Sequence, residues 1–294
     1  MTKTAFLAIV GRPNVGKSTL LNTVCGEKIA IVSNKPQTTR NRITGIYTKG
    51  EDQFVFLDTP GIHKPRTALG DYMVKTANGS IGEADAILLV IEPVPSVGDI
   101  EAGILEKIRA SKTSAILVVN KVDEHTPADI AATIAAYAAV YDFAAVVPIS
   151  AKSGKGVDAL LEEASKFLYE SAWYFPEDAV TDQPERQIAA EIIREKLLRT
   201  LNKEIPHGTA VVIEEFKEEK NIIRIRAEIF CEKASHKGII VGKNGAALKL
   251  VGTYAREDLE KFLGTKVYLN LWVKVKENWR ESAATVGNFG YRDE

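Results

Sequence analysis

The chain has 294 residues, more than one average domain of about 100–150 residues, which predicts two domains joined by a linker. Its 45% hydrophobic and 26% charged residues are typical of globular proteins and argue against low-complexity or collagen-like structure. The net charge of -1 divides into -4 through residue 184 and +3 from residue 185 onward, so the second part is the better candidate for nucleic-acid contact.

Targeting and cysteine patterns are those of an intracellular protein. No run of about 18 apolar residues occurs, and the N-terminal apolar run leads into a glycine-rich loop, so we expect a cytoplasmic protein without a cleaved signal. Cys25 and Cys231 lie far apart and lack the spacing of a disulfide framework or a zinc site.

The first part of the chain alternates short apolar runs with segments of helical spacing. Strands are predicted at residues 5–10, 54–57, 86–91, 115–119 and 145–149, with helices that include 99–110 and 127–141. This alternation predicts an α/β domain with a mostly parallel sheet and helices on both faces. An antiparallel hairpin, residues 43–48 and 53–57 around the turn KGED, is expected at one edge.

Residues 173–184 carry two prolines and several acids without periodicity, so we read them as a linker between domains at 1–172 and 185–294. A helix that ends near Tyr169 is expected before this linker. Beyond the linker the order of the elements changes. We expect a helix at 185–203, strands at 209–216 and 222–231, two helices flanking 242–245, and a strand at 266–275. The order αββααβ predicts a separate α+β domain.

The sequence GRPNVGKS follows the first strand and precedes a helix, which is the setting of a P-loop. Glycines let backbone N–H groups surround phosphate oxygens, and the helix N-terminus adds its dipole. Lys17 is expected to bind the β- and γ-phosphates, and Ser18 to bind magnesium. The predicted phosphate-binding residues are Gly11, Arg12, Pro13, Asn14, Val15, Gly16, Lys17, Ser18 and Thr19.

Two further motifs indicate guanine as the base. NKVD follows the strand 115–119 at the carboxyl edge, where open parallel sheets bind ligands. Its Asp123 can accept hydrogen bonds from the exocyclic amine and the ring N–H of guanine, an arrangement of donors that adenine cannot satisfy. SAK follows the next strand and is expected to donate a backbone N–H to the guanine carbonyl. The predicted base-binding residues are Asn120, Lys121, Val122, Asp123, Ser150, Ala151 and Lys152.

DTPG follows the strand 54–57 and is expected to respond to the γ-phosphate, with Asp58 holding magnesium through a water and Gly61 presenting an N–H. In the loop KPQTTRNR, either Thr38 or Thr39 should contact magnesium and the γ-phosphate, and we favour Thr39. The predicted magnesium ligands are Ser18, Thr39 and Asp58, and the predicted nucleotide contacts from the DTPG loop are Asp58, Thr59, Pro60, Gly61 and Ile62.

Ile62 follows DTPG at the position where Ras-like enzymes carry a glutamine that orients water. An isoleucine has no polar group for this task, so hydrolysis is expected to borrow a group from elsewhere or to run slowly until a partner binds. We read the adjacent His63 as a solvated loop residue rather than as a base. Lys17, Thr39 and Gly61 remain the candidates for stabilising the reacting phosphate.

The second part contains GKNG between a short apolar helix and a longer one, which indicates the GxxG loop of a KH domain. Its glycines permit close approach of a sugar-phosphate backbone, and an apolar groove beside such a loop accepts about four unpaired bases. The predicted RNA-binding residues are Gly238, Ile239, Ile240, Val241, Gly242, Lys243, Asn244, Gly245, Arg224 and Arg226. A basic, aromatic patch is either a further contact or a solvated strand end, and it consists of Lys274, Lys276 and Arg280 near Trp272 and Trp279.

Together GRPNVGKSTLLN, PQTTR, DTPGIH, NKVD and SAK resemble the Era family of GTPases, and the KH-like second part extends the resemblance over essentially the whole chain. The αββααβ order resembles the type II KH topology. The resemblance implies a magnesium-dependent GTPase that converts GTP to GDP, binds the 3′ region of 16S ribosomal RNA and assists maturation of the small ribosomal subunit. It also implies a catalytic role for Asn14 as a ligand of potassium.

The resemblance further implies some association with the inner face of the membrane, and we expect a monomer that does not bind DNA. A signalling GTPase whose KH-like domain binds protein or the membrane surface remains the alternative. RNA binding distinguishes the two functions.

Overall fold

The structure is a computed structural model that describes residues 1–62, 65–201 and 205–292. The chain divides into two compact units, described separately below. The first contains residues 1–30, 39–65 and 73–182, and the second contains residues 31–38, 66–72 and 183–294. The predicted loop residue His63 lies outside the described part of the chain.

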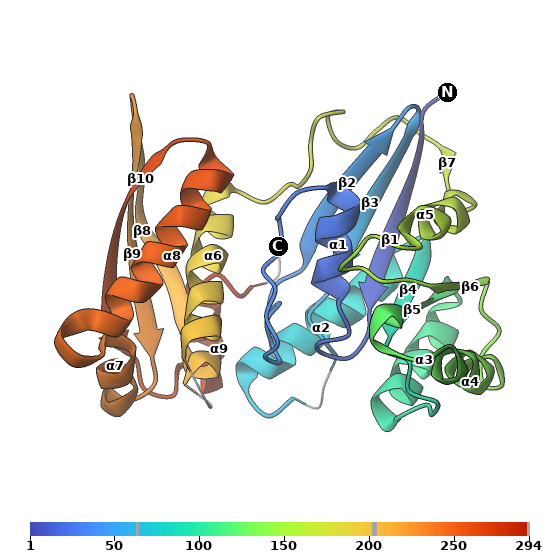
Figure 1. The fold of residues 1–294 in the computed structure, drawn as a ribbon, viewed down its shortest axis with the longest axis horizontal. Helices are drawn as coiled ribbons and strands as arrows, with labels where there is room; N and C mark the ends of the chain where they lie inside the picture. The colour runs from blue at the N-terminus through green and yellow to red at the C-terminus, as the bar shows by residue number, and fades with distance from the viewer. Residues whose placement is uncertain (63–64, 202–204, 293–294) are drawn as a thin grey trace. The chain divides into compact units, whose positions relative to one another are not determined.

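The first unit is built on a seven-stranded sheet in which six strands have the order β2-β3-β1-β4-β5-β6 (Figure 1). β2 is antiparallel to β3, and the other pairs along this order are parallel. The predicted strands, the edge hairpin and the α/β class are therefore confirmed. The strands are β1 (Lys3–Val10), β2 (Ile43–Lys49), β3 (Asp52–Asp58), β4 (Ala86–Ile91), β5 (Ser114–Val119) and β6 (Ala145–Pro148).

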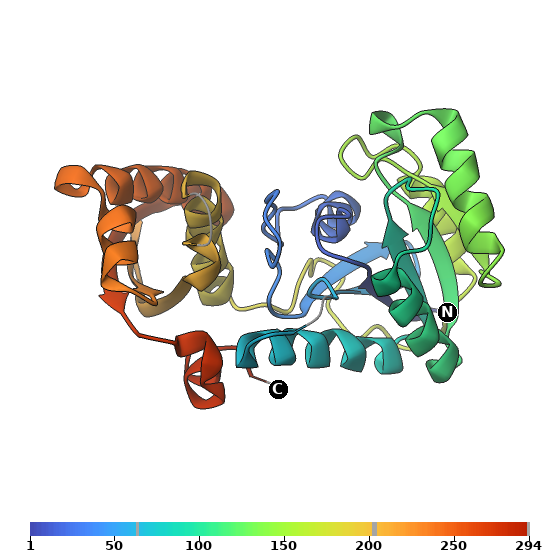
Figure 2. The same cartoon turned by 90° about the horizontal axis from the view of Figure 1, so that it is seen from below.

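Helices cover both faces of this sheet, and Figure 2 shows α1 and α2 on opposite sides of its strands. One apolar core joins the sheet to α1 (Lys17–Cys25) and α5 (Val157–Ser165). The other joins it to α2 (Ala68–Glu83), α3 (Asp99–Ser111) and α4 (Pro127–Ala138). Because β4 and its neighbours are buried on both faces, they read as continuous apolar runs in the sequence.

The end of the first unit differs from the prediction. The helix expected to reach Tyr169 ends at Ser165, and Tyr169–Glu170 forms a two-residue strand, β7, that pairs antiparallel with β1. A two-residue strand is too short to produce a visible sequence pattern.

The second unit is an α+β domain with the predicted order αββααβ. Its strands have the order β10-β9-β8, with β9 parallel to β10 and antiparallel to β8. Three helices pack on one face of this sheet and share a single apolar core with it. The elements are α6 (Glu185–Thr200), β8 (Ala210–Glu219), β9 (Ile222–Cys231), α7 (Ala234–Val241), α8 (Ala246–Leu263), β10 (Lys266–Val275) and α9 (Ala283–Asn288).

Alternation along β9 fixes which side chains face the helices. Ile223 and Ile225 lie in the core with α6, α7 and α8, so Arg224 and Arg226 project from the opposite face of the sheet. In the described part of the chain, no helix combines the length and the apolar character that crossing a lipid bilayer requires.

Candidate functional site

The loop between β1 and α1 follows a path that glycine permits. Gly11 has φ of 153° and Gly16 has φ of 98°, both in the region that side chains with a Cβ avoid. A Cβ on Gly11 would collide with the carbonyl oxygen of Val90, and one on Gly16 with the side-chain amide of Asn120. These two glycines therefore let the loop curl tightly against the neighbouring strands, as a phosphate-binding loop requires.

Lys17 stands at the start of α1 and is buried. Its ammonium donates hydrogen bonds to the backbone carbonyls of Gly11 and Arg12, at 3.2 and 3.0 Å. Burial lowers the pKa of Lys17 to about 8, although the nearby Asp58 carboxylate acts in the opposite direction. A cation removed from water and held only by two carbonyls and one carboxylate is suited to receive a phosphate anion.

The predicted magnesium ligands converge on one another. The Ser18 hydroxyl donates to Asp58 Oδ2 at 2.6 Å and lies 2.8 Å from the Thr39 hydroxyl. Asp58 Oδ1 is buried and has no hydrogen-bond partner in the described residues. Burial raises the pKa of Asp58 to about 6, against the opposing effects of Lys17 and Ser18. Two hydroxyl oxygens and a carboxylate whose Oδ1 has no hydrogen-bond partner among the described residues fit a magnesium ion, which prefers oxygen ligands.

Between the two candidate threonines, the geometry favours Thr39. The hydroxyl of Thr38 donates to the carbonyl of Lys35 at 2.6 Å and lies 2.7 Å from the Ser33 hydroxyl. It is therefore engaged within its own loop, whereas the Thr39 hydroxyl lies beside Ser18.

The predicted base-binding motifs meet at Asn120, which is buried at the end of β5. Its amide nitrogen donates to the carbonyl of Val15 at 2.7 Å, and its amide oxygen accepts from the N–H of Ala151 at 2.9 Å. Asn120 therefore ties the P-loop to SAK instead of projecting toward a base. Because Ala151 uses its N–H in this way, Lys152, whose N–H bonds to no described residue, becomes the SAK candidate for the guanine carbonyl.

Asp123 keeps an exposed carboxylate. The pKa of Asp123 lies below its usual range because the Ser150 hydroxyl and its own backbone N–H donate to the carboxylate. Asp123 is thus an ionised, oriented acceptor, as pairing with the two adjacent donors of guanine requires.

Glu92 follows β4 and was not predicted as a site residue. Its carboxylate forms ion pairs with both Arg12 and Lys121, the former at 2.7 Å. Burial acts to raise the pKa of Glu92, but Lys121 and Arg12 hold it below the ordinary value. Glu92 therefore joins the P-loop to NKVD electrostatically. A single acidic residue after a strand does not predict this role from the sequence.

The DTPG loop packs closely on the P-loop. Thr59 donates its hydroxyl to the carbonyl of Ile9 at 2.9 Å, and the N–H of Ile62 donates to the carbonyl of Gly11 at 3.2 Å. A Cβ on Gly61 would stand 2.8 Å from Pro13, so only glycine fits this contact. Ile62 is buried in the core between the sheet and α2, which leaves it unable to meet a water molecule at the phosphates.

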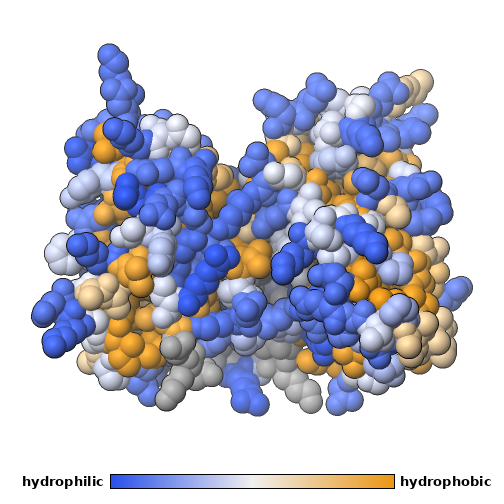
Figure 3. Space-filling view, viewed as in Figure 1, coloured by the Kyte–Doolittle hydropathy of each residue, from blue (hydrophilic) through white to orange (hydrophobic). Residues whose placement is uncertain are grey.

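In the second unit, GKNG forms a tight turn between α7 and α8. Gly242, Asn244 and Gly245 have φ of 73°, 51° and 79°, and Lys243 and Asn244 are exposed at the tip. Ile239 is also exposed, and the space-filling view in Figure 3 shows apolar surface at the place that α7 occupies in Figure 1. The loop thus presents the hydrogen-bond donors of Lys243 and Asn244 near the apolar side chain of Ile239.

Three predicted residues are placed differently from the prediction. Ile240 is fully buried in the core, so it cannot line a groove. Arg224 and Arg226 lie on the face of the sheet away from α7 and α8, so they do not stand beside GKNG. Alternation along the strand predicted that the two arginines share one face of the sheet, but it could not predict on which face the helices pack.

The predicted patch around Trp272 and Trp279 is also divided. Trp279 is fully buried, and its indole N–H donates to the carbonyl of Gly208 at 2.9 Å. Arg280 pairs with Glu232 at 2.6 Å. Trp272 remains exposed, at 59% of its surface, and Lys274 and Lys276 are exposed as well.

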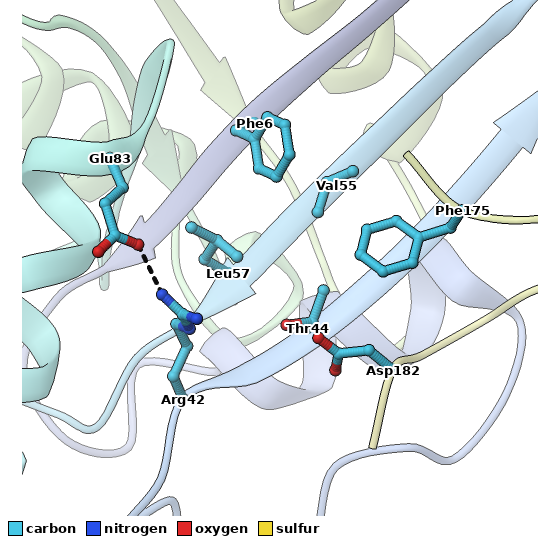
Figure 4. Close-up of a pocket in the computed structure, with 8 residues that line it drawn as sticks. All are labelled: Phe6, Arg42, Thr44, Val55, Leu57, Glu83, Phe175 and Asp182. Carbon is cyan, nitrogen blue, oxygen red and sulfur yellow. Dashed lines mark hydrogen bonds and ion pairs between the residues drawn. The ribbon is translucent and has the colours of Figure 1, made fainter. Parts of the chain in front are cut away.

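A cavity of about 200 Å³ lies elsewhere in the first unit, along β1, β2 and β3 (Figure 4). The Arg42–Glu83 ion pair at 2.6 Å crosses one end of it. None of the predicted nucleotide-binding residues lines it, so we assign it no part in the site. Its lining residues are Phe6, Arg42, Thr44, Val55, Leu57, Glu83, Phe175 and Asp182.

Comparisons with known proteins agree with this geometry. Residues 6–121 match the family model described as 50S ribosome-binding GTPase, and residues 204–280 match the model of the KH domain. GTPase Era of Clostridioides difficile is 52% identical over 296 residues, covering 100% of both chains. GTPase Era of Clostridium kluyveri is 51% identical over 293 residues, covering 99% of this chain and 100% of the relative.

Two solved structures resemble the whole chain, each with a TM-score of 0.95 and 40% sequence identity. One is Era in complex with MgGDPNP and nucleotides 1506–1542 of 16S ribosomal RNA, and each chain is covered completely. The other is an Aquifex aeolicus Era variant bound to GDP and AlF4⁻, which covers 99% of this chain and 100% of that one. With relatives of this identity along its full length, the chain belongs to the Era family of GTPases.

Proposed function

We propose that this protein is a GTP-driven switch that binds the 3′ region of 16S ribosomal RNA through its KH unit and assists assembly of the small ribosomal subunit. The observation that carries the proposal is the full-length similarity to the Era structure that holds MgGDPNP and nucleotides 1506–1542 of 16S ribosomal RNA. The complete nucleotide site and the exposed GKNG loop of this chain supply the two required binding elements.

The residues of the first unit divide the work of binding and hydrolysis. The P-loop amides and Lys17 bind the phosphates, while Asp123 selects guanine. Ser18, Thr39 and Asp58 would hold magnesium, which neutralises charge on the phosphate oxygens when it is bound. Gly61 lies against Pro13 and presents its N–H to the γ-phosphate.

The second unit supplies a path from the γ-phosphate to the RNA. It includes residues 31–38, and within it the buried Arg194 donates a hydrogen bond to the carbonyl of Thr38. Arg199 donates to the carbonyl of Val32 at 3.0 Å, so both ends of this segment are held by α6. Thr39 follows immediately in the chain. When hydrolysis releases Thr39 from the nucleotide site, the segment before it therefore loses its attachment to the nucleotide, and this change reaches α6 of the KH unit through the bonds to Thr38 and Val32.

The KH loop gives the direct test of RNA binding. We expect Lys243→Glu to weaken binding of an RNA of nucleotides 1506–1542 of 16S ribosomal RNA about tenfold or more, because it places a negative charge at the exposed tip of the loop. Gly245→Asp should act in the same direction, since it also adds a negative charge to the loop; its Cβ meets no neighbouring atom, although the φ of 79° strains any residue other than glycine. Filter binding measures both, with Lys261→Glu on α8 as the matched control.

The outcome also separates the two candidate functions. If the unmutated protein binds this RNA no better than an unrelated RNA of the same length, the signalling alternative, with protein or the membrane surface as its partner, replaces this proposal. Gly242→Asp is less useful as a variant, because its Cβ would stand 2.7 Å from the Cβ of Ala247 and would disturb the start of α8.

We further propose that Asn14 helps to hold a potassium ion that takes the place of an arginine finger. Asn14 stands exposed on the P-loop in a left-handed conformation with φ of 67°, and its side-chain amide oxygen is a hard ligand of the kind that potassium prefers. We expect GTP turnover by the unmutated protein to be about tenfold faster in potassium than in sodium, and Asn14→Ala to remove the difference. Equal rates in the two salts would contradict this assignment.

The remaining features of the proposal rest on the sequence pattern and, for the membrane, on the resemblance to the family. We propose domains at residues 1–172 and 185–294 with a linker at 173–184, and a monomeric protein in the cytoplasm. Partial association with the inner face of the membrane belongs to the same proposal.

A further inference from the structure

The face of the second sheet turned away from α6, α7 and α8 carries an unusual group of side chains. Alternation places Tyr268, Asn270 and Trp272 of β10 beside Arg224 and Arg226 of β9 on this face. The stacking of Phe230 on Phe289 covers only one end of it. We define the sheet surface as these five residues: Tyr268, Asn270, Trp272, Arg224 and Arg226.

The two aromatic side chains of the sheet surface are exposed. Tyr268 exposes 50% of its surface and Trp272 exposes 59%. They are four residues apart on one strand, about 13 Å at the usual rise of an extended chain, with the polar Asn270 between them. Large rings displayed singly on a polar face are suited to stacking of separate planar groups, whereas a protein interface uses a continuous apolar patch.

The surrounding charge is mainly positive. Five cationic side chains project from this face of the sheet, against three carboxylates. The guanidinium of Arg224 lies 5.2 Å from the centre of the Tyr268 ring and pairs with Glu219 at 3.1 Å, whereas Arg226 makes no ion pair with any residue in the described part of the chain. The cations are Lys217, Arg224, Arg226, Lys266 and Lys274, and the acids are Glu215, Glu219 and Glu228.

We propose that the sheet surface is a second RNA site, separate from GKNG, that binds unpaired nucleotides with bases stacked on Tyr268 and Trp272 and phosphates near Arg224 and Arg226. Exposed aromatic side chains with neighbouring cations are the combination by which proteins bind single strands. Paired bases cannot stack on the rings, so a duplex does not fit. This inference rests on the proposed RNA-binding function and extends it to a second surface.

The strand order makes a continuous path for one RNA geometrically reasonable. β10 is the edge strand of the sheet, and its inward side packs on α7 and α8, the helices that flank GKNG. A single strand held at GKNG therefore has only one sheet edge to pass before it reaches Tyr268 and Trp272. An RNA longer than four nucleotides should engage both surfaces, whereas a tetranucleotide should engage one.

The test compares two lengths of RNA. With the RNA of nucleotides 1506–1542, Tyr268→Ala/Trp272→Ala should bind about tenfold to a hundredfold more weakly than the unmutated protein. Tetranucleotides that together cover the same RNA form the second set of ligands. Those whose binding is lost in Lys243→Glu should bind the double variant as tightly as the unmutated protein. Arg226→Ala should reduce the slope of log K against log salt by about 0.7 for each lost phosphate contact.

Matched variants and a spectroscopic signal keep the result specific. Trp272→Phe retains a ring and should preserve most of the affinity, and Lys261→Ala removes a charge from the helical side and should change nothing. RNA binding should quench tryptophan fluorescence in the unmutated protein and much less in Trp272→Phe. Equal affinity of the double variant for the long RNA would overturn the second site while leaving Lys243-dependent binding intact.

Two other outcomes also overturn the inference. If no RNA binds the unmutated protein, the proposed function itself fails. If the long RNA binds the double variant normally but sedimentation shows a self-association that the double variant loses, the sheet surface is a contact between copies of the chain.

Discussion

Lys17→Ala should lower GTP turnover at least a hundredfold and weaken GDP binding strongly. The ammonium of Lys17 is buried and is held by two carbonyls of its own loop, which fixes its positive charge where the phosphates are expected to bind. Binding of a fluorescent GDP analogue and phosphate release measure the two effects. Lys166→Ala is the matched control and should behave as the unmutated protein, because Lys166 is an exposed lysine at the C-cap of α5.

Guanosine provides a sharper comparison, because it lacks phosphates. We expect its binding to be weak and to depend on Asp123 and not on Lys17, so it should survive Lys17→Ala. If the variant loses guanosine and GDP binding equally, the substitution has disrupted the fold instead of the phosphate site. Retention of full turnover would remove Lys17 from the mechanism.

Asp123→Asn should change the base that the protein accepts. The carboxylate of Asp123 is exposed and accepts a hydrogen bond from the Ser150 hydroxyl, and we propose that it pairs with two donors of guanine. Asparagine offers one acceptor and one donor, which match xanthine, where a carbonyl replaces the exocyclic amine. We expect GTP affinity to fall at least a hundredfold and xanthosine triphosphate to bind better than GTP, because unpaired polar groups are costly in such a site.

Competition binding with the two triphosphates measures this exchange. Asn120→Ala serves as the contrast, because Asn120 bonds to Val15 and Ala151 and so supports the loops without selecting the base. It should weaken both triphosphates together. An unchanged preference for GTP in Asp123→Asn would show that another group reads the base.

The nucleotide site was largely predictable from the sequence because its chemistry depends on short motifs that follow strands. Gly11, Gly16 and Lys17 are required at fixed offsets by loop geometry, and parallel strands bring the ends of β1, β3 and β5 to one edge. The role of Glu92 was missed because it arises from two ion pairs between distant parts of the chain.

The second unit shows where periodicity fails. The burial of Ile240 and Trp279 depends on which neighbours pack around them, and a stretch such as GIIV is compatible with either a core or a groove. Alternation paired Arg224 with Arg226 but could not decide between the two faces of the sheet. The helix α2 was not among the predicted helices, since its three glycines, Gly70, Gly79 and Gly82, and its mixed polarity weaken the helical pattern.

GTP turnover with and without the RNA of nucleotides 1506–1542, measured in potassium, tests most directly the claim that hydrolysis is coupled to RNA. Because Ile62 is buried and supplies no polar group, turnover by the protein alone should be slow, and the RNA should raise it several-fold. Lys243→Glu should lose most of this stimulation while keeping the slow basal rate. Identical turnover with and without saturating RNA would contradict the account.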